Sequence, residues 1–260
     1  MRIIEKERVG SDPLAVLREI ETAEGDVAVP AICLPVLTGA AKLRPNGRGA
    51  YAGHFIFPAQ CPHAADAGVG ERFCAAFLLL LLMPWLLCLT LAVLLYDGFP
   101  ALFWQERYGQ DGKPFRMVKF RTMLRHAPEL HAQLQAREGM GTHLFKLADD
   151  PRVTRFGAVL RRGFFDEQPQ LWNIILGDMR MVGPRPLPAS DHAHYTHPCH
   201  RLRLGGKPGL TGLWQVSGRN DRTFDEMCLL DVFYLRNRST ALDLRILWRT
   251  LAMLLGNAPR

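Results

Sequence analysis

One uninterrupted apolar run dominates the pattern of hydrophobic and polar positions along this chain. Residues 73–96 read FCAAFLLLLLMPWLLCLTLAVLLY and contain no charged side chain. A helix of about 20 predominantly apolar residues is long enough to span the roughly 30 Å hydrocarbon core of a bilayer. The run therefore predicts a helix that enters a membrane.

A proline in the middle of the run leaves two arrangements open. Pro84 removes one backbone donor and clashes with the carbonyl four residues back, so a helix kinks or breaks there. Each half would be about 17 Å long, or half the hydrocarbon thickness. The segment either crosses as one kinked helix or enters and returns as a helical hairpin. A cluster of cations predicts a cytoplasmic location for the chain that follows: Arg107, Lys113, Arg116, Lys119, Arg121 and Arg125.

Shorter patterns predict the remaining elements. The turn pairs Asp97-Gly98 and Asp111-Gly112, with the alternating stretch 115–120, favour a short β-hairpin. Residues 1–70 show no long periodicity and are expected to form a poorly ordered N-terminal extension. Helical composition or periodicity occurs in three further stretches: residues 126–138, residues 152–178 with a break near Gly163, and residues 223–255. The expected fold class is α+β and mainly helical.

The net charge indicates which classes of partner the protein binds, and the cysteine content indicates its cellular compartment. The 260 residues carry a net charge of +7. Such a balance favours anionic partners such as lipid headgroups, nucleotides, phosphates or nucleic acid. The chain shows no stacking array or recognised nucleic-acid module, so we expect no nucleic-acid partner. The six cysteines include no CxxC pair, which indicates a reducing compartment.

Two adjacent carboxylates, Asp166 and Glu167, lie among arginines in the sequence. The surrounding cations are Arg152, Arg155, Arg161, Arg162, Arg180 and Arg185. One interpretation is that both carboxylates are exposed to solvent and only balance the positive charge of nearby arginines. The other is a nucleophilic carboxylate beside a metal-binding one, because phosphoryl transfer needs a positioned nucleophile and cations near the phosphoryl oxygens.

Two further motifs offer cations for phosphate binding. Pro184 and Pro186 fix the backbone on either side of Arg185, whose planar guanidinium suits bidentate phosphate binding. Lys119 and Arg121 stand at i and i+2, which places them on one face of a strand. The alternatives are a turn with an incidental arginine and an exposed basic edge.

The order of these motifs resembles that of the bacterial sugar transferases, the monotopic polyprenyl-phosphate phosphoglycosyl transferases, and most of all their short exopolysaccharide-priming members. The resemblance covers residues 71–255. It rests on the Pro-broken apolar run followed by QERYG at 105–109, KFRTM at 119–123, DDPRVTR at 149–155, LRR at 160–162, DEQPQL at 166–171, GDM at 177–179, VGPRP at 182–186 and KPGLTGLWQ at 207–215.

The resemblance implies a monotopic membrane protein with a re-entrant helical hairpin broken at Pro84. It implies transfer of a sugar-1-phosphate from a nucleotide sugar, usually a UDP-sugar, to undecaprenyl phosphate. Asp166 would be the catalytic nucleophile that forms a covalent phosphosugar intermediate, and Glu167 would serve Mg²⁺ as catalytic and metal-binding residue. Arg185 would hold phosphate. Lys119, Arg121, Arg152 and Arg161 complete the predicted substrate-binding set.

The predicted organisation has three parts: an extension over residues 1–70, a re-entrant membrane helix over residues 71–97 and a cytosolic catalytic domain over residues 98–260. The expected location is the cytoplasmic face of the bacterial inner membrane, with its lipid as a partner. The identity of the sugar and homo-oligomerisation stay open. Relatives usually carry Ser-Leu before the Asp-Glu pair and Leu after it, where this chain has Phe164, Phe165 and Gln168. These departures motivate the alternative of a catalytically weak, membrane-anchored assembly partner.

Overall fold

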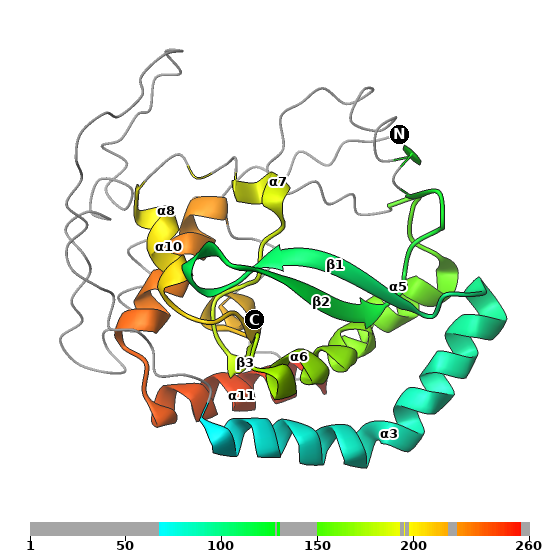
Figure 1. Ribbon diagram of the computed structural model, residues 1–260, viewed down its shortest axis with the longest axis horizontal. Helices are drawn as coiled ribbons and strands as arrows, with labels where there is room; N and C mark the ends of the chain where they lie inside the picture. Colours follow the sequence, from blue (N-terminus) through cyan, green and yellow to red (C-terminus); the bar gives the residue numbers. More distant parts are fainter. Residues whose placement is uncertain are drawn as a thin grey trace, which may run out of the picture.

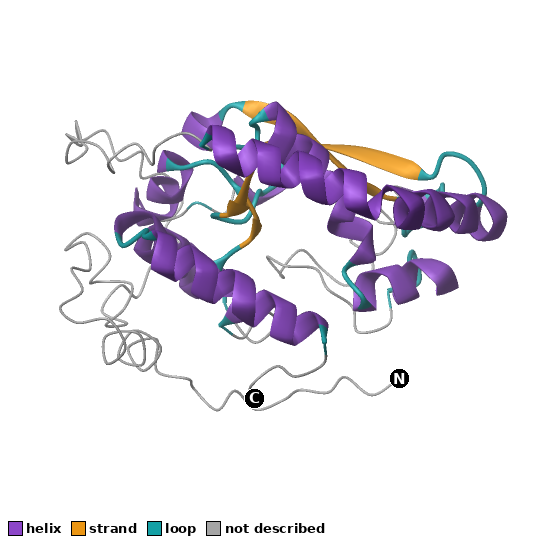
Figure 2. Ribbon diagram, turned by 90° about the horizontal axis from the view of Figure 1, so that it is seen from below, coloured by secondary structure: helices purple, strands orange, loops and turns teal. Residues whose placement is uncertain are grey.

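The computed structural model describes residues 68–127, 129–130, 150–192, 195, 198–217 and 223–255. This part of the chain is mainly helical, with two small two-stranded sheets (Figures 1 and 2). The predicted α+β class is therefore confirmed. Residues 1–67 of the predicted extension lie outside the described residues, as do residue 128 and residues 131–138 of the predicted helix over residues 126–138.

The apolar run forms one long helix, α3 (Val69–Asp97), which contains Pro84. The helix bends partway along its length (Figure 1), as expected where a proline removes a helical hydrogen bond. It is long and apolar enough to cross a membrane, and most of its apolar side chains face away from the protein. The structure thus describes a single bent helix; the residues alone left a kinked helix and a hairpin open, and the resemblance implied the re-entrant hairpin.

Both ends of α3 are bound to the same folded unit. Near its start, the Glu71 carboxylate lies 2.9 Å from the Arg180 guanidinium. At its end, the hydroxyl of Thr154 donates to the Asp97 carboxylate over 2.9 Å. Arg121 donates to the backbone carbonyls of Asp97 and Gly98, which are among the unpaired acceptors of the helix C-terminus. These contacts lay the helix along one side of the protein.

The predicted β-hairpin is confirmed. Strands β1 (Leu102–Tyr108) and β2 (Pro114–Phe120) are antiparallel, with Gln105 opposite Met117. The 3₁₀ turn η2 (Gln110–Gly112) joins them, and Asp111 and Gly112 take the positive φ values that an Asp-Gly turn provides.

A broken helical segment lies between the hairpin and α3 (Figure 1). It consists of α5 (Arg155–Arg162), the 3₁₀ segment η3 (Phe165–Gln170) and α6 (Leu171–Leu176). Thr154 caps α5 by accepting a hydrogen bond from the backbone of Gly157, and Gly163 ends it, which confirms the predicted break. Two apolar clusters join this segment to α3 and the hairpin; they include Leu86, Leu89, Phe120, Leu160, Met117, Leu171 and Ile174.

The C-terminal half builds a second core. Strands β3 (Arg180–Val182) and β4 (Gly209–Thr211) pair in parallel. The helical elements of this half are α7 (Ala189–His192), α8 (Pro198–Leu202), η4 (Arg203–Gly205), α9 (Leu213–Val216), α10 (Phe224–Arg236) and α11 (Thr240–Leu254). The periodic stretch 223–255 is therefore two helices, because residues 237–239 leave the helical path between them.

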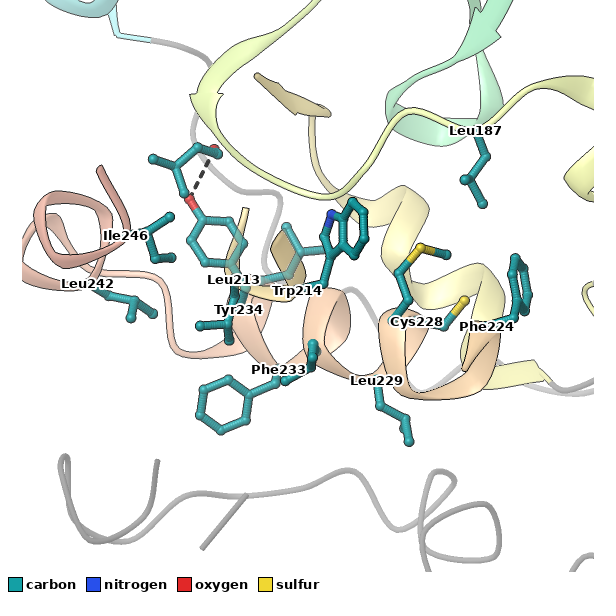
Figure 3. Packing of buried hydrophobic residues seen from close by; sticks show 14 residues of the cluster. Leu187, Leu213, Trp214, Phe224, Cys228, Leu229, Phe233, Tyr234, Leu242 and Ile246 are labelled. Atoms are coloured by element: carbon teal, nitrogen blue, oxygen red, sulfur yellow. Dashed lines mark hydrogen bonds between the residues drawn. The ribbon is translucent and has the colours of Figure 1, made fainter. Parts of the chain in front are cut away.

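Buried side chains of β3, α9, α10 and α11 form the centre of this second core (Figure 3). Trp214 and Tyr234 are its largest members, exposed by only 3% and 1%. The Tyr234 hydroxyl donates to the carbonyl of Val182 over 3.1 Å and so ties α10 to β3. The core thereby fixes the chain that follows β3, which carries Arg185.

Candidate active site

Asp166 lies at the first turn of η3, and the local sequence forces its position. Phe164 adopts a left-handed conformation at φ 57°, which bulky residues rarely do. A Cβ atom at Gly163 would stand 2.3 Å from the Phe165 ring, so a larger residue there would displace that ring. The resulting sharp turn between α5 and η3 directs Asp166 inward, where only 8% of it stays exposed.

The surroundings of Asp166 make it an unusual carboxyl group. Burial, and next the charge of Glu167, raise the pKa of Asp166 to about 6. The positive charges of Lys119 and Arg161 act in the opposite direction. Burial, and next the charge of Arg107, lower the pKa of Lys119 to about 8. A partly desolvated carboxyl group and a partly desolvated ammonium group thus lie in one site.

A pocket opens beside these two groups. Its walls are formed by Arg107, Met117, Lys119, Glu167, Gln170, Arg185, Pro186, Gly209, Leu210 and Gln215. Three cations therefore converge on it from β1, β2 and the turn after β3. An anionic ligand is the natural occupant of such a pocket, because the walls supply both charge and fixed donors.

Arg107 is a pocket residue that the sequence reasoning did not assign to the site. Its guanidinium donates to the Pro186 carbonyl over 3.2 Å and to the Gln105 side chain over 2.7 Å. Burial, and next the charge of Arg185, lower the pKa of Arg107 to about 10. The hairpin register places Arg107 and Lys119 on one face of the sheet. That register, once inferred, would have identified Arg107.

Arg185 lies in the turn between β3 and α7, between Pro184 and Pro186. Its backbone N–H donates to the buried carboxylate of Asp231 over 3.3 Å. Its guanidinium carbon lies 4.8 Å from the centre of the Trp214 ring, a cation–π distance. The structure therefore gives the predicted phosphate-binding arginine a fixed backbone and a fixed stacking partner at the pocket wall.

The backbone of the Pro-Arg-Pro turn lies in close contact with the backbone of β4. A Cβ atom at Gly209 would stand 2.0 Å from the backbone nitrogen of Gly183. The Gly209 N–H donates to the carbonyl of Pro184 over 2.9 Å. Glycine at these two positions is thus required by the contact between the Pro-Arg-Pro turn and β4.

Of the other predicted substrate-binding arginines, Arg161 acts on the charge of Asp166, whereas Arg152 and Arg121 bind other partners. Arg161 donates to the Thr122 hydroxyl over 2.9 Å and belongs to the electrostatic surroundings of Asp166. Arg152 forms an ion pair with Asp150 at 2.7 Å. Arg121 lies at the end of α3, where it donates to backbone carbonyls. Lys119 lines the pocket whereas the Arg121 side chain binds the end of α3, so the structure does not bring Arg121 and Lys119 together as one clamp.

Within the described residues, no three His, Cys, Asp or Glu side chains gather as metal ligands. Mg²⁺ seldom needs such a cage, because it is usually bound by one or two carboxylates together with substrate phosphates and water. Glu167 lines the cationic pocket next to Asp166, which fits this donor set.

Comparisons with known proteins cover most of the chain. Residues 68–257 match the family model described as bacterial sugar transferase. The chain is 43% identical over 160 residues to galactosyl transferase CpsE of Streptococcus agalactiae, covering 61% of this chain and 35% of that protein. It is 39% identical over 183 residues to the exopolysaccharide production protein ExoY of Rhizobium meliloti, covering 68% and 80%.

A third relative carries a more detailed name. The chain is 36% identical over 183 residues to the UDP-glucose:undecaprenyl-phosphate glucose-1-phosphate transferase of Escherichia coli, covering 68% of this chain and 37% of that protein. The chain thus spans little more than a third of the length of two of these relatives and most of the length of the third.

Proposed function

Because the chain belongs to the bacterial sugar transferase family, we propose that it transfers a sugar-1-phosphate from a nucleotide sugar to undecaprenyl phosphate and so primes exopolysaccharide synthesis. The observation that carries this proposal is the buried Asp166 beside a pocket with three converging cations. The names of the relatives in Rhizobium meliloti and Escherichia coli agree with it and favour a UDP-sugar as donor.

In the proposed reaction, a carboxylate oxygen of Asp166 attacks the phosphorus that bears the sugar. A bond forms between that oxygen and phosphorus, and the bond from phosphorus to the nucleoside monophosphate breaks. An oxygen of undecaprenyl phosphate then attacks the same phosphorus and displaces Asp166. A pKa near 6 leaves the carboxylate ionised at neutral pH, yet burial keeps it poorly solvated and therefore reactive.

The cations perform the electrostatic part of the proposed reaction. A carboxylate cannot approach a diphosphate unless positive charge offsets the repulsion between them. Lys119 and Arg161 lie close enough to act on the Asp166 charge, whereas Arg107 and Arg185 line the pocket. Glu167 would hold Mg²⁺, which would supply further charge neutralisation on the phosphate oxygens.

The membrane arrangement belongs to the same proposal. We infer that α3 is re-entrant and that the catalytic unit lies on the cytoplasmic face of the inner membrane. Glu71 and Asp97, at opposite ends of α3, both bind this unit, which favours entry and exit on one side. Helix α11 lies on the same side of the molecule as α3 (Figures 1 and 2) and exposes Leu244 and Trp248. A lipid-borne acceptor would then reach the site at headgroup level.

A donor screen tests the proposed activity. Purified protein in nanodiscs with undecaprenyl phosphate and Mg²⁺ is incubated with a panel of nucleotide sugars, and the released nucleoside monophosphate is measured. We expect release with at least one UDP-sugar. Intact-protein mass spectrometry without acceptor is expected to find a phosphosugar adduct on Asp166.

The Asp166→Asn variant serves as the control, since it keeps the shape of the site and lacks the nucleophile. If the wild-type protein releases no monophosphate from any donor, the enzyme assignment is wrong. A membrane-anchored assembly partner then becomes the better interpretation.

A further inference from the structure

A buried ion pair lies behind the Arg185 turn and has no part in the reaction proposed above. Arg203 in η4 and Asp231 in α10 are exposed by only 2% and 1%. The Arg203 Nε donates to Asp231 Oδ2 over 3.0 Å, and Arg203 Nη2 donates to the same oxygen. Buried ion pairs are weak contributors to stability, because desolvation offsets much of their attraction. The placement of this pair therefore calls for another physical reason.

The pair binds both backbone polar groups of Arg185. The Arg185 N–H donates to Asp231 Oδ2 over 3.3 Å, and Arg203 Nη2 donates to the Arg185 carbonyl over 2.7 Å. The neighbours Pro184 and Pro186 have restricted φ angles. The peptide groups on either side of Arg185 are thus held by ionised partners within the core, where charge-assisted hydrogen bonds are strong.

The fixed backbone sets the direction of the Arg185 side chain. Its guanidinium stacks on Trp214 at 4.8 Å. Trp214 is itself held in the C-terminal core (Figure 3) and is 3% exposed. Arg185 reaches the pocket wall, whereas neither Arg203 nor Asp231 is among the residues that form it. The pair therefore does not line the pocket, and its contact with a residue that does is the one with the Arg185 backbone.

We propose that Arg203 and Asp231 are positioning residues that hold Arg185 in the orientation in which it binds the diphosphate of the nucleotide sugar, an inference that rests on the proposed function. A guanidinium binds phosphate best when its planar fork is already aligned, because less conformational freedom is lost on binding. The buried pair provides this alignment before the donor arrives.

The test is a double-mutant cycle with inorganic pyrophosphate and Mg²⁺ as probe, titrated calorimetrically into the full chain in nanodiscs. The Arg203→Met/Asp231→Leu double variant replaces the pair with apolar side chains, a change that buried ion pairs often tolerate without loss of stability. We expect a folded protein whose melting temperature falls only through the loss of the two hydrogen bonds to the Arg185 backbone, and about tenfold weaker pyrophosphate binding. In an Arg185→Ala background, the same double change is expected to weaken binding no further, because its effect passes through Arg185.

A second variant keeps the proposal testable if the double variant does not fold. Arg203→Lys retains a positive charge beside Asp231 but lacks the fork that reaches both Asp231 and the Arg185 carbonyl. We expect weaker pyrophosphate binding and a higher KM for the donor with a smaller change in kcat. Arg238→Gln, which removes a 3.7 Å ion pair with Asp243, is the matched control and should bind as the wild type does.

Three results would overturn the proposal. The folded pair variants could bind pyrophosphate as tightly as the wild type does, or the double change could weaken pyrophosphate binding equally with Arg185 present and with Arg185 replaced by alanine. The third result is that the wild type shows no measurable pyrophosphate binding. A different result would contradict the proposed function: the wild-type protein binds pyrophosphate but releases no nucleoside monophosphate from any donor.

Discussion

The indole ring of Trp85 lies edge-on to the phenyl ring of Phe165, with 5.5 Å between the ring centres. Trp85 directly follows Pro84 in α3, and Phe165 directly precedes Asp166. The bend of the apolar helix and the turn that carries Asp166 are therefore joined by one aromatic pair. The pair fixes Phe165 from the membrane-facing side, since the Trp85 side chain belongs to the proposed lipid-embedded helix.

The first prediction concerns this pair. Trp85→Ala should lower kcat roughly tenfold, because loss of an aromatic contact worth about 1 kcal/mol leaves the Asp166 turn free to shift, and small displacements slow group transfer strongly. Monophosphate release by protein in nanodiscs measures the effect. Leu87→Ala, at an exposed position of the same helix, is the control. Equal activities of the two variants would show that the Trp85–Phe165 contact has no catalytic role.

The second prediction is a pH profile with two limbs. In the proposed reaction Asp166 attacks as a carboxylate, so kcat/KM should rise as the pH passes its pKa of about 6. Lys119 must stay protonated to offset charge, so the rate should fall as the pH passes its pKa of about 8. In Lys119→Arg the upper limb should move to higher pH, because a guanidinium stays charged. An upper limb that does not move would exclude Lys119 as its source.

Part of this site could be predicted from sequence because covalent neighbours stay close in any fold. The Asp166–Glu167 pair and the Pro-Arg-Pro turn each occupy one short segment, so the sequence identified both as candidates, although their roles came only from the family resemblance. The hairpin was likewise predictable, because its turn and its alternation are local signals.

Long-range features were not predictable in the same way. The joining of Arg107 to Lys119 depends on hairpin register, and that of Arg203 to Asp231 depends on how η4 packs on α10. The expected Lys119–Arg121 clamp does not form, because the Arg121 side chain binds carbonyls at the end of α3 while Lys119 lines the pocket. Such contacts are decided by tertiary packing, which the alternation of a single strand does not reveal.

The third prediction links Asp166 to stability. Its folded pKa of about 6 lies above the ordinary value of 3.8. A carboxyl group of this kind favours the folded state while protonated, and this stabilisation is lost as the pH rises through about 6. Asp166→Asn removes the buried charge, so at pH 8 it should raise the free energy of unfolding by about 3 kcal/mol. This value is an upper limit, because it converts the whole difference of roughly two between the folded and the ordinary pKa into free energy.

Thermal unfolding in detergent at pH 4.5 and pH 8 checks this prediction. The variant should exceed the wild type in melting temperature by several degrees at pH 8 and by much less at pH 4.5. Asp178→Asn, a carboxyl near α6 that is more exposed, is the control. A gap between Asp166→Asn and the wild type that is the same at both pH values would contradict the burial of an ionised carboxylate.

The last prediction concerns the path of α3 in the membrane. Val69 is the first residue of the helix and Phe99 lies just beyond its end; they are exposed by 72% and 74%. In a chain without native cysteines, Val69→Cys and Phe99→Cys should both react with a membrane-impermeant maleimide in inverted vesicles and not in intact spheroplasts. A re-entrant helix gives this result because both of its ends lie on the cytoplasmic side.

The Pro84→Leu variant is expected to change the path of α3 through the membrane. It restores the missing helical hydrogen bond and should straighten the helix to a span of about 43 Å. A straight helix of this length crosses the bilayer, so labelling of the Val69→Cys site should move to the spheroplasts, and the contact between Glu71 and Arg180 should be lost. Leu87→Ala is the control and should keep both labelled sites cytoplasmic. If position 69 is labelled from outside while Pro84 is intact, α3 spans the membrane and is not re-entrant.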